Sequence, residues 1–303
     1  METVTLLLDL LGFEFADHKL QQFSCKATVL GVEVDFSQAN KDRILIGNKV
    51  GRLEEVKDLL GDVIKKGSLT SRECSRLLGR LQYFDSFVMG RDGRLAMTEL
   101  RANIQSDSKT ATLTAEAKTS LGLMLDRLES GRPRELPCSF ESQPVLVFTD
   151  GASEQDVNTI GGLLFVDGTF RYFACHAPDG LIDAWKTISK HVIAMVELYG
   201  VVVARFLWKK YLRGRKSIAF VDNESAKEAL VKGSSHNLHF RNLLPQFEMA
   251  EKENRSWMWI SRVPSASNPG DGPSRGDVTF AEALGAVRDS CACPVLGIQL
   301  RDL

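Results

Sequence analysis

The spacing of hydrophobic residues changes about halfway along this 303-residue chain. In the first half the hydrophobic positions recur mostly every three or four residues, in one stripe from Leu53 to Ile64 and another from Cys74 to Phe84. This spacing places them on one face of an α-helix, so each stripe predicts a helix. Gly67 follows the first stripe where a helix would end, and Thr70 with Glu73 has the pattern of a capping box before the second.

Three more elements and a loop are predicted in the first 140 residues. Residues 6–11 carry leucines on one helical face, and residues 30–36 alternate between apolar and polar side chains as a half-buried strand does. A further helix is predicted over residues 115–128. The loop at residues 130–137, with one glycine and two prolines, predicts a domain boundary.

Beyond this loop the pattern favours strands. The expected strands are residues 145–149, 160–166, 169–176, 217–221 and 257–263, and the expected helices are residues 189–211, 224–231 and 238–251. Asp167 and Gly168 predict a hairpin turn between the second and third strands. Together these elements predict a mixed α/β fold in which helices flank a mixed five-stranded sheet. Trp257 and Trp259 share one strand face and are expected to be packing residues.

Composition narrows the class of protein. The net charge is -1, so the total charge predicts no polyanionic partner and any nucleic-acid surface must be local. The six cysteines have no zinc-ligand spacing and are interpreted as reduced thiols. Residues 1–11 lack a basic leader, and no apolar run approaches the roughly 20 residues of a membrane span. We therefore expect an intracellular protein, cytoplasmic or nuclear, that does not enter a membrane.

Four carboxylates fall where this topology would gather them. Asp150 and Asp222 each end a predicted strand, Glu197 is the one charged residue between Val192 and Ala204, and Asp271 follows the last strand. Acids buried side by side are costly unless a positive charge neutralises them. Two Mg²⁺ or Mn²⁺ ions bound by oxygen ligands would do so, and two such ions can drive phosphodiester hydrolysis.

Each acid also has an ordinary structural interpretation. Asp150 lies in a Thr-Asp-Gly sequence that is typical of turns, and Glu197 could be neutralised by a lysine. Asp222 with Asn223 could cap the following helix. Asp271 lies in a proline- and glycine-rich loop and could be a turn former. The four positions in this order favour a shared metal site over four separate structural roles.

The same residues carry a resemblance to a known family. Thr-Asp-Gly-Ala at 149–152, Val-Glu-Leu-Tyr-Gly at 196–200, Val-Asp-Asn-Glu-Ser-Ala at 221–226 and Asn-Pro-Gly-Asp-Gly-Pro-Ser-Arg at 268–275 resemble the four-carboxylate pattern of ribonuclease H, in the version fused to gypsy-like and DIRS-like reverse transcriptases. Upstream, Leu-Gly-Phe at 11–13, Lys19 and Val-Leu-Gly at 29–31 are similar to the end of a polymerase palm. Leu-Gly-Arg-Leu at 78–81 and Gly-Arg at 90–91 resemble the thumb or connection.

The resemblance implies a division of the chain and a function. Residues 1–40 would be a reverse transcriptase palm remnant, 41–105 a helical thumb or connection, 106–140 a connecting helix and linker, 141–286 a ribonuclease H-like domain and 287–303 a C-terminal tail. The activity implied is a metal-dependent endonuclease that hydrolyses the RNA strand of an RNA–DNA hybrid, with Asp150, Glu197, Asp222 and Asp271 as catalytic metal ligands. Polymerase activity is not expected, because no Tyr-x-Asp-Asp motif precedes Lys19. The missing fingers and palm would have to come from a partner.

Two other functions share this fold. One is a catalytically inactive nucleic-acid-binding scaffold from a decayed or domesticated retroelement, and the absence of a histidine before Asp271 leaves turnover open. The other is a nuclease or integrase acting on DNA. The presence of all four acids favours an enzyme, and their order together with the upstream resemblance favours ribonuclease H.

A concentrated basic segment predicts where nucleic acid binds. The predicted contact residues are Arg205, Lys209, Lys210, Arg213, Arg215 and Lys216, which are interleaved with aromatic residues. The segment leads into the strand that ends at Asp222, so a hybrid resting on it would be expected near the metals. An ordinary solvated helix end is the alternative interpretation.

Overall fold

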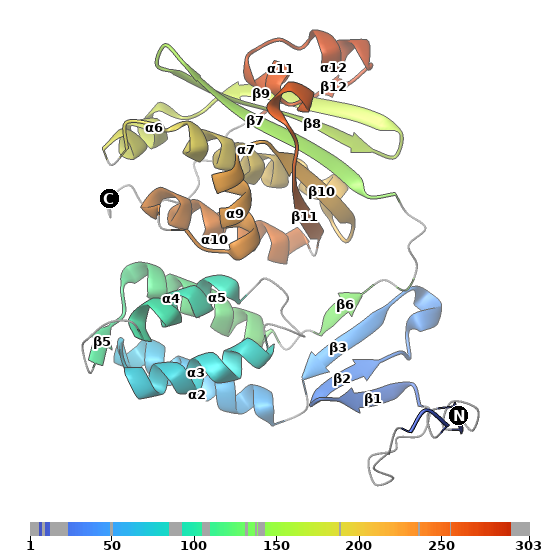
Figure 1. Cartoon of the computed structure of the whole chain (residues 1–303), viewed down its shortest axis with the longest axis vertical. Helices are drawn as coiled ribbons and strands as arrows, with labels where there is room; N and C mark the ends of the chain where they lie inside the picture. The colour runs from blue at the N-terminus through green and yellow to red at the C-terminus, as the bar shows by residue number, and fades with distance from the viewer. Residues whose placement is uncertain are drawn as a thin grey trace.

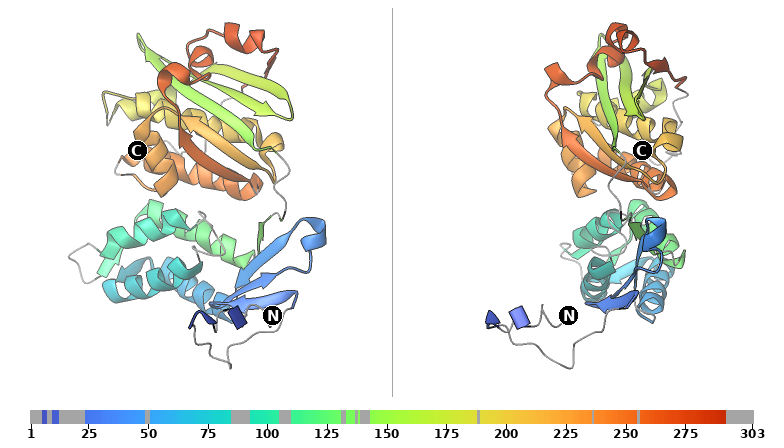
Figure 2. Two further views of the ribbon diagram at one scale, coloured as in Figure 1. Left: turned by 45° about the vertical axis from the view of Figure 1, so that its right-hand side comes forward. Right: turned by 90° about the vertical axis from the view of Figure 1, so that its right-hand side faces the viewer.

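The computed structural model describes residues 6–7, 10–12, 24–48, 51–84, 93–104, 110–130, 133–136, 138, 143–187, 189–235, 237–254 and 256–291. Two large hydrophobic cores divide them, one built from residues 56–128 and the other from residues 145–260. Figure 1 shows the corresponding halves stacked along the long axis, and both views in Figure 2 keep them distinct. We call them the N-terminal half and the C-terminal half.

A small antiparallel sheet opens the N-terminal half. Its order is β1 (Lys26–Val29), β2 (Val32–Asp35), β3 (Ile44–Asn48) and β6 (Arg134–Leu136). Leu30 and Gly31, at φ 51° and 79°, form the turn between β1 and β2, so the single strand predicted from residue 30 is wrong at its start. β6 comes from the predicted linker and pairs with β3. Of the predicted N-terminal helix, the described leucines at 6, 7, 10 and 11 are exposed.

Among the residues that the structure describes, four helices form the rest of this half. They are α2 (Arg52–Lys66), α3 (Ser71–Phe84), α4 (Arg94–Ile104) and α5 (Ala115–Glu129), with the short strands β4 (Ser68–Thr70) and β5 (Thr110–Thr112) beside them. Gly67 ends α2 in the left-handed conformation, as predicted. The capping box is confirmed, because Thr70 Oγ1 accepts from the Glu73 amide at 3.2 Å and Glu73 Oε2 accepts from the Thr70 amide at 2.8 Å.

The C-terminal half is built on a six-stranded mixed sheet. Its order is β11 (Trp257–Arg262), β10 (Lys216–Val221), β7 (Val145–Glu154), β8 (Val157–Val166), β9 (Thr169–His176) and β12 (Val287–Arg288). β7, β8 and β9 are antiparallel, whereas β10 runs parallel to both β7 and β11. The five predicted strands and the Asp167-Gly168 turn are confirmed. The count of five is corrected to six by β12, a two-residue strand too short to leave a periodic signal.

Helices cover both faces of this sheet (Figure 1). They are α6 (Asp179–Lys186), α7 (Ile193–Leu207), α8 (Lys209–Leu212), α9 (Glu224–Lys232), α10 (Leu238–Asn254), α11 (Asp271–Ser274) and α12 (Thr279–Ala283). The helix predicted over 189–211 is interrupted at Trp208, and α6 was not predicted. Trp259 is 72% exposed, so its prediction as a packing residue is wrong. No described helix combines the length and apolarity needed to cross a membrane.

Two glycines let helices approach the sheet from opposite faces. A Cβ on Gly151 of β7 would lie 2.8 Å from the backbone nitrogen of Glu197 in α7. A Cβ on Gly161 of β8 would lie 2.2 Å from the backbone nitrogen of Ser274 in α11. Real Cβ atoms do not come this close, so both contacts require glycine. The two helices thus sandwich the centre of the sheet.

The side chain of Arg94, which lies among the described residues, contacts the C-terminal half. The guanidinium of Arg94 in α4 donates a hydrogen bond to the Val231 carbonyl in the last turn of α9. A Cβ on Gly233, which ends α9 at φ 62°, would lie 2.9 Å from the Cβ of Arg94. The cation therefore sits at the negative end of the α9 dipole, where it is favourable.

We expect Gly161→Ala to lower the free energy of unfolding by about 1–3 kcal/mol, because the new methyl group must push α11 away from β8. Gly180→Ala in α6 is the matched control, since nothing lies within 4 Å of its Cβ position. Urea denaturation followed by circular dichroism measures both. Equal stability of the Gly161 variant and the parent would contradict this account of α11 packing.

Candidate metal centre

Three of the four predicted acids meet at one place. Asp150 lies within β7, Glu197 in the second turn of α7 and Asp222 directly after β10. One carboxylate oxygen from each forms a group whose members all lie within 4.8 Å of one another. The predicted convergence of these three acids is a feature of the structure.

Strand register explains the convergence. β10 and β7 run parallel, with Phe220 opposite Phe148, so Asp222 continues the register to the level of Asp150. Side chains two residues apart on a strand share a face, which places both aspartates on the same side. Asp150 pairs with Gly161, whose face is covered by α11. Glu197 enters from α7 beside Gly151, where no side chain obstructs it.

Burial raises the free-energy cost of ionising these carboxyl groups. Asp150 is 3% exposed and Glu197 9% exposed. Burial, with the charges of Asp222 and Asp150, raises the pKa of Glu197 to about 8. Burial also raises the pKa of Asp150 to about 6, although a hydrogen bond from Ser274 acts against the shift. The folded chain therefore holds more protons here than ordinary carboxylates would at neutral pH.

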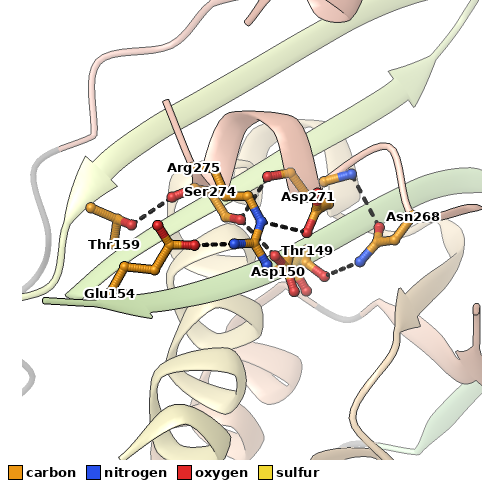
Figure 3. Close-up of polar contacts among 9 residues, drawn as sticks. Thr149, Asp150, Glu154, Thr159, Asn268, Asp271, Ser274 and Arg275 are labelled. Carbon is orange, nitrogen blue, oxygen red and sulfur yellow. Dashed lines mark hydrogen bonds and ion pairs between the residues drawn. The ribbon is translucent and has the colours of Figure 1, made fainter. Parts of the chain in front are cut away.

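Ser274 and Asn268 fix the surroundings of Asp150 (Figure 3). The Ser274 hydroxyl lies 2.5 Å from Asp150 Oδ2, to which it donates, and Thr159 Oγ1 donates to the Ser274 carbonyl at 2.5 Å. The Asn268 amide donates to the Thr149 carbonyl at 3.0 Å, while its oxygen accepts from the Gly270 amide at 3.1 Å. Ser274 and Asn268 both lie in the 268–275 motif, but their roles depend on contacts with β7 and β8 that the motif alone does not indicate.

Asp271 is the exception among the four acids. It begins α11, its side chain is 40% exposed, and its Oδ1 accepts from Arg275 Nε at 2.9 Å. Arg275 also pairs with Glu154 (Figure 3). Asp271 is close enough for its charge to raise the pKa of Asp150, yet it lies outside the group of three. Its carboxylate is engaged by a cation of the chain itself.

The structure tests the alternative structural interpretations of Glu197 and Asp222. In the part of the chain that the structure describes, no lysine pairs with Glu197, so neutralisation by lysine does not explain its burial. Asn223 caps α9, because its Oδ1 accepts from the Ala226 amide at 3.0 Å. Capping therefore does not account for Asp222.

The acid group fits a divalent cation. Its donors are all carboxylate oxygens, which Mg²⁺ and Mn²⁺ prefer. Glu197 Oε2 and Asp222 Oδ1 are buried and have no hydrogen-bond partner among the described residues. Unsatisfied buried oxygens are rare in folded proteins, and a bound ion is a common reason for them. Asp150, Glu197 and Asp222 could thus hold a metal, with Asp271 adjacent.

Arg205 must be removed from the predicted nucleic-acid contacts. It is fully buried, donates to Ser256 Oγ at 2.8 Å, and lies 3.6 Å from Glu251 Oε1. Its guanidinium also stacks over the Phe247 ring at 4.7 Å. A side chain enclosed in this way reaches no phosphate, so its role is to link α7 to α10.

The remaining basic residues lie farther from the acids than the sequence implied. Lys209, Lys210 and Arg213 are exposed, whereas Arg215 pairs with Asp167 through two hydrogen bonds of 2.6 and 2.7 Å. Lys216 begins β10 and Asp222 follows its end. Six residues of strand span about 20 Å, so the segment occupies the opposite end of β10 from the acid group.

The order of elements in the C-terminal half defines its fold. β7, β8 and β9 form an antiparallel meander, and α7 crosses one face of the sheet to β10. α9 and α10 then lead to β11, and α11 follows on the opposite face. The fold is ribonuclease H-like.

Similar solved structures cover just under half of this chain. RNase H1 from the halophilic archaeon Halobacterium salinarum NRC-1 is 15% identical, with a TM-score of 0.34 over 46% of this chain and 100% of that chain. The N-terminal RNase H domain of rv2228c from Mycobacterium tuberculosis, solved as a fusion with maltose-binding protein, is 15% identical, with a TM-score of 0.34 over 48% and 100%. LC11-RNase H1 in complex with an RNA/DNA hybrid is 11% identical, with a TM-score of 0.37 over 46% and 99%. No family model matches the chain, and no curated protein matches it.

We expect the stability of the metal-free protein to fall as pH rises from about 4.5 to about 8. A carboxyl group whose pKa is higher in the folded state binds its proton more tightly there, so its contribution to stability is lost as pH rises through the folded pKa. Glu197, with a pKa raised to about 8, is the main such group. Adding Mg²⁺ or Mn²⁺ should restore more stability at pH 8 than at pH 5.

Thermal unfolding in chelator and in metal, from pH 5 to 8, measures this effect. Other groups also titrate in this range, including His239, whose pKa burial lowers. Glu197→Gln is therefore the control, because the difference between parent and variant isolates one carboxyl group. A difference that stays constant across the range would contradict the prediction.

Proposed function

We propose that residues 141–286 form a ribonuclease H-type endonuclease that hydrolyses the RNA strand of an RNA–DNA hybrid with two Mg²⁺ or Mn²⁺ ions. The observation that supports this proposal best is the group of Asp150, Glu197 and Asp222, with oxygens within 4.8 Å and burial that raises two of the pKa values. Acids retained together at this cost are typical of a functional site.

The ions, when bound, would supply an activated water and neutralise the leaving oxygen during in-line displacement. The protein would hold the metal-binding carboxylates in rigid positions. Asp150 and Asp222 are fixed by neighbouring strands and Glu197 by α7, so their carboxylates need little rearrangement. The Ser274 hydroxyl holds one oxygen of Asp150 in place. We assign Asp271 to the same ions, where a cation would replace its contact with Arg275.

The choice of an RNA–DNA hybrid rests on the sequence resemblance. All four carboxylate motifs occur in the order of ribonuclease H, and the last ends in Pro-Ser-Arg at 273–275. Recognition would depend on the shape of the minor groove and on 2′-hydroxyl groups, which distinguish a hybrid from duplex DNA. An inactive scaffold and a DNA-directed nuclease are the alternatives that a cleavage assay separates.

The N-terminal half is assigned on the same basis. We propose that residues 1–40 are a reverse transcriptase palm remnant, 41–105 a thumb or connection and 106–140 a connecting helix and linker of a retroelement protein. The sequence contains no Tyr-x-Asp-Asp motif, so this chain would not extend a primer by itself. A partner carrying fingers and palm would be needed for polymerisation.

We expect Asp150→Asn and Asp222→Asn to reduce metal-dependent hybrid cleavage by about 10²-fold or more, because each removes a charge that would hold the ions. Gel assays with a hybrid, duplex RNA and duplex DNA measure rate and substrate choice. Asp156→Asn is the matched control, since this exposed aspartate at the β7–β8 turn pairs with Lys186 at 2.8 Å.

Four outcomes of this assay are distinguishable. Cleavage of the hybrid alone supports the proposal, and cleavage of duplex DNA would favour the DNA-directed alternative. Folded parent protein that binds Mn²⁺ or the hybrid but cuts nothing would favour the inactive scaffold. Asparagine variants that cut at the parent rate would contradict the assignment of the acids.

We also expect replacement of Lys209, Lys210 and Arg213 by alanine to weaken hybrid binding. Each lost phosphate contact should change the slope of log affinity against log salt by about 0.7–0.9. Fluorescence anisotropy at several salt concentrations measures the slope. A charge-matched control replaces Lys41, Lys65 and Lys118, which are exposed in the N-terminal half. Equal slopes for parent and segment variant would show that this segment is an ordinary solvated helix end.

A further inference from the structure

Cys175 and Cys291 are 116 residues apart in sequence and adjacent in space. Their Sγ atoms lie 2.8 Å apart, and both side chains pack, partly buried, against the core beneath α7. Cys175 belongs to β9 and Cys291 follows β12. They lie on the face of the sheet that α7 covers, whereas Asp150 points towards α11. The proposed nuclease chemistry does not use them.

Strand register, rather than a chance contact of side chains, brings these thiols together. β12 pairs parallel with β9, with Val287 opposite Arg171 and Arg288 opposite Tyr172. Cys291 lies three residues beyond Arg288 and Cys175 three residues beyond Tyr172, so an extension of this register past the end of β12 would set the two cysteines opposite one another. Neighbouring strands lie about 4.8 Å apart. This spacing falls within the Cα separation of roughly 4.4–6.8 Å that disulfides require.

Asp289 anchors the segment that carries Cys291. We call residues 287–291 the C-terminal strap. Arg171 donates to both oxygens of Asp289, from Nε at 2.8 Å and from Nη2 at 2.5 Å, and Trp208 Nε1 donates at 2.8 Å. The Asp289 amide donates to the Tyr172 carbonyl at 2.8 Å. These contacts hold the strap against β9 and involve neither thiol, so the strap stays beside β9 whichever state the thiols are in.

We infer that Cys175 and Cys291 are a redox-responsive pair that forms an intramolecular disulfide. The thiolate of one cysteine attacks a small-molecule disulfide such as oxidised glutathione, which forms a mixed disulfide and releases one glutathione thiolate. The thiolate of the second cysteine then attacks the protein sulfur and expels the second glutathione. Two protein thiols lose two electrons, the small disulfide gains them, and the two protons pass to the released thiolates.

The bond would attach the strap, and with it β12, to β9. β12 has only two residues, so its ladder contributes few hydrogen bonds to the strap. A disulfide here would close a loop of more than 100 residues, and closing a long loop restricts the unfolded chain strongly. The loop would contain Glu197, Asp222 and Asp271. Oxidation would therefore stabilise the whole framework that carries the acids, while reduction would leave the strap to the contacts of Asp289.

Other cysteines provide internal controls. Cys74 is buried in the N-terminal half, where its thiol donates to the Leu100 carbonyl at 2.9 Å. Burial raises its pKa to about 11, which disfavours the reactive thiolate. Cys25 is exposed on the same half. Cys293 lies outside the described residues and is close in sequence to Cys291, so the experiment must separate these two.

The test uses the full chain equilibrated with reduced or oxidised glutathione. Thiols are blocked with light N-ethylmaleimide, disulfides are reduced and labelled with the heavy reagent, and peptides are mapped by mass spectrometry. We expect heavy label on Cys175 and Cys291 together, and an unreduced digest containing their joined peptides. The oxidised chain should unfold at a temperature higher by roughly 5 °C or more.

Cys291→Ser should abolish the joined peptide and the shift in unfolding temperature, whereas Cys25→Ser should retain both. Light label on Cys175 and Cys291 in oxidised glutathione would overturn the inference, as would a parent chain in which Cys175 joins Cys293. The peptide map of the parent decides the question even if a variant folds poorly. Because no readout involves cleavage, failure of the proposed nuclease activity would leave this result unaffected.

Discussion

Repulsion among Asp150, Glu197 and Asp222 is the constraint on which the rest of the C-terminal half depends. Three carboxylates with oxygens inside 4.8 Å would separate if they were on mobile loops. They remain together because paired parallel strands fix two of them and a long buried helix fixes the third. Burial, together with the charges of the neighbouring acids, raises the pKa values of Asp150 and Glu197, so this arrangement favours their protonated forms. A divalent cation would be attracted by these closely spaced carboxylates, so the same arrangement would favour metal binding.

Two glycines make this arrangement possible because they have no side chain to block the neighbouring helices. Gly151 admits the backbone of α7 at Glu197, and Gly161 admits α11 at Ser274. α11 has only four residues and cannot be stable by itself, so its position depends on what it rests on. The bond from Thr159 to the Ser274 carbonyl and the bond from Ser274 to Asp150 tie it to β8 and β7. Local backbone contact therefore controls the environment of a buried acid.

Sequence periodicity predicted the central strands, most of the helices and the meeting of three acids, because these depend on local pattern and simple strand order. The predictions failed where contacts with residues distant in the sequence determine the structure. Arg205 looked like part of a basic surface, but Glu251 and Phe247 enclose it from α10. Asp271 was expected to join the other acids, and the sequence could not show that Arg275 would engage it. β12 is too short to have a period, so the register that aligns two cysteines was also invisible.

The hydrogen bond from Arg94 to Val231 gives the two halves a second point of attachment, in addition to the chain between β6 and β7. This contact lies away from the chain connection, so it adds a separate restraint between the halves. α9 ends at this second point and begins beside Asp222, about 13 Å away along its axis. α9 therefore runs from the contact between the two halves to the residue next to Asp222, so a displacement of the helical half at Arg94 would reach the acid group along one continuous helix.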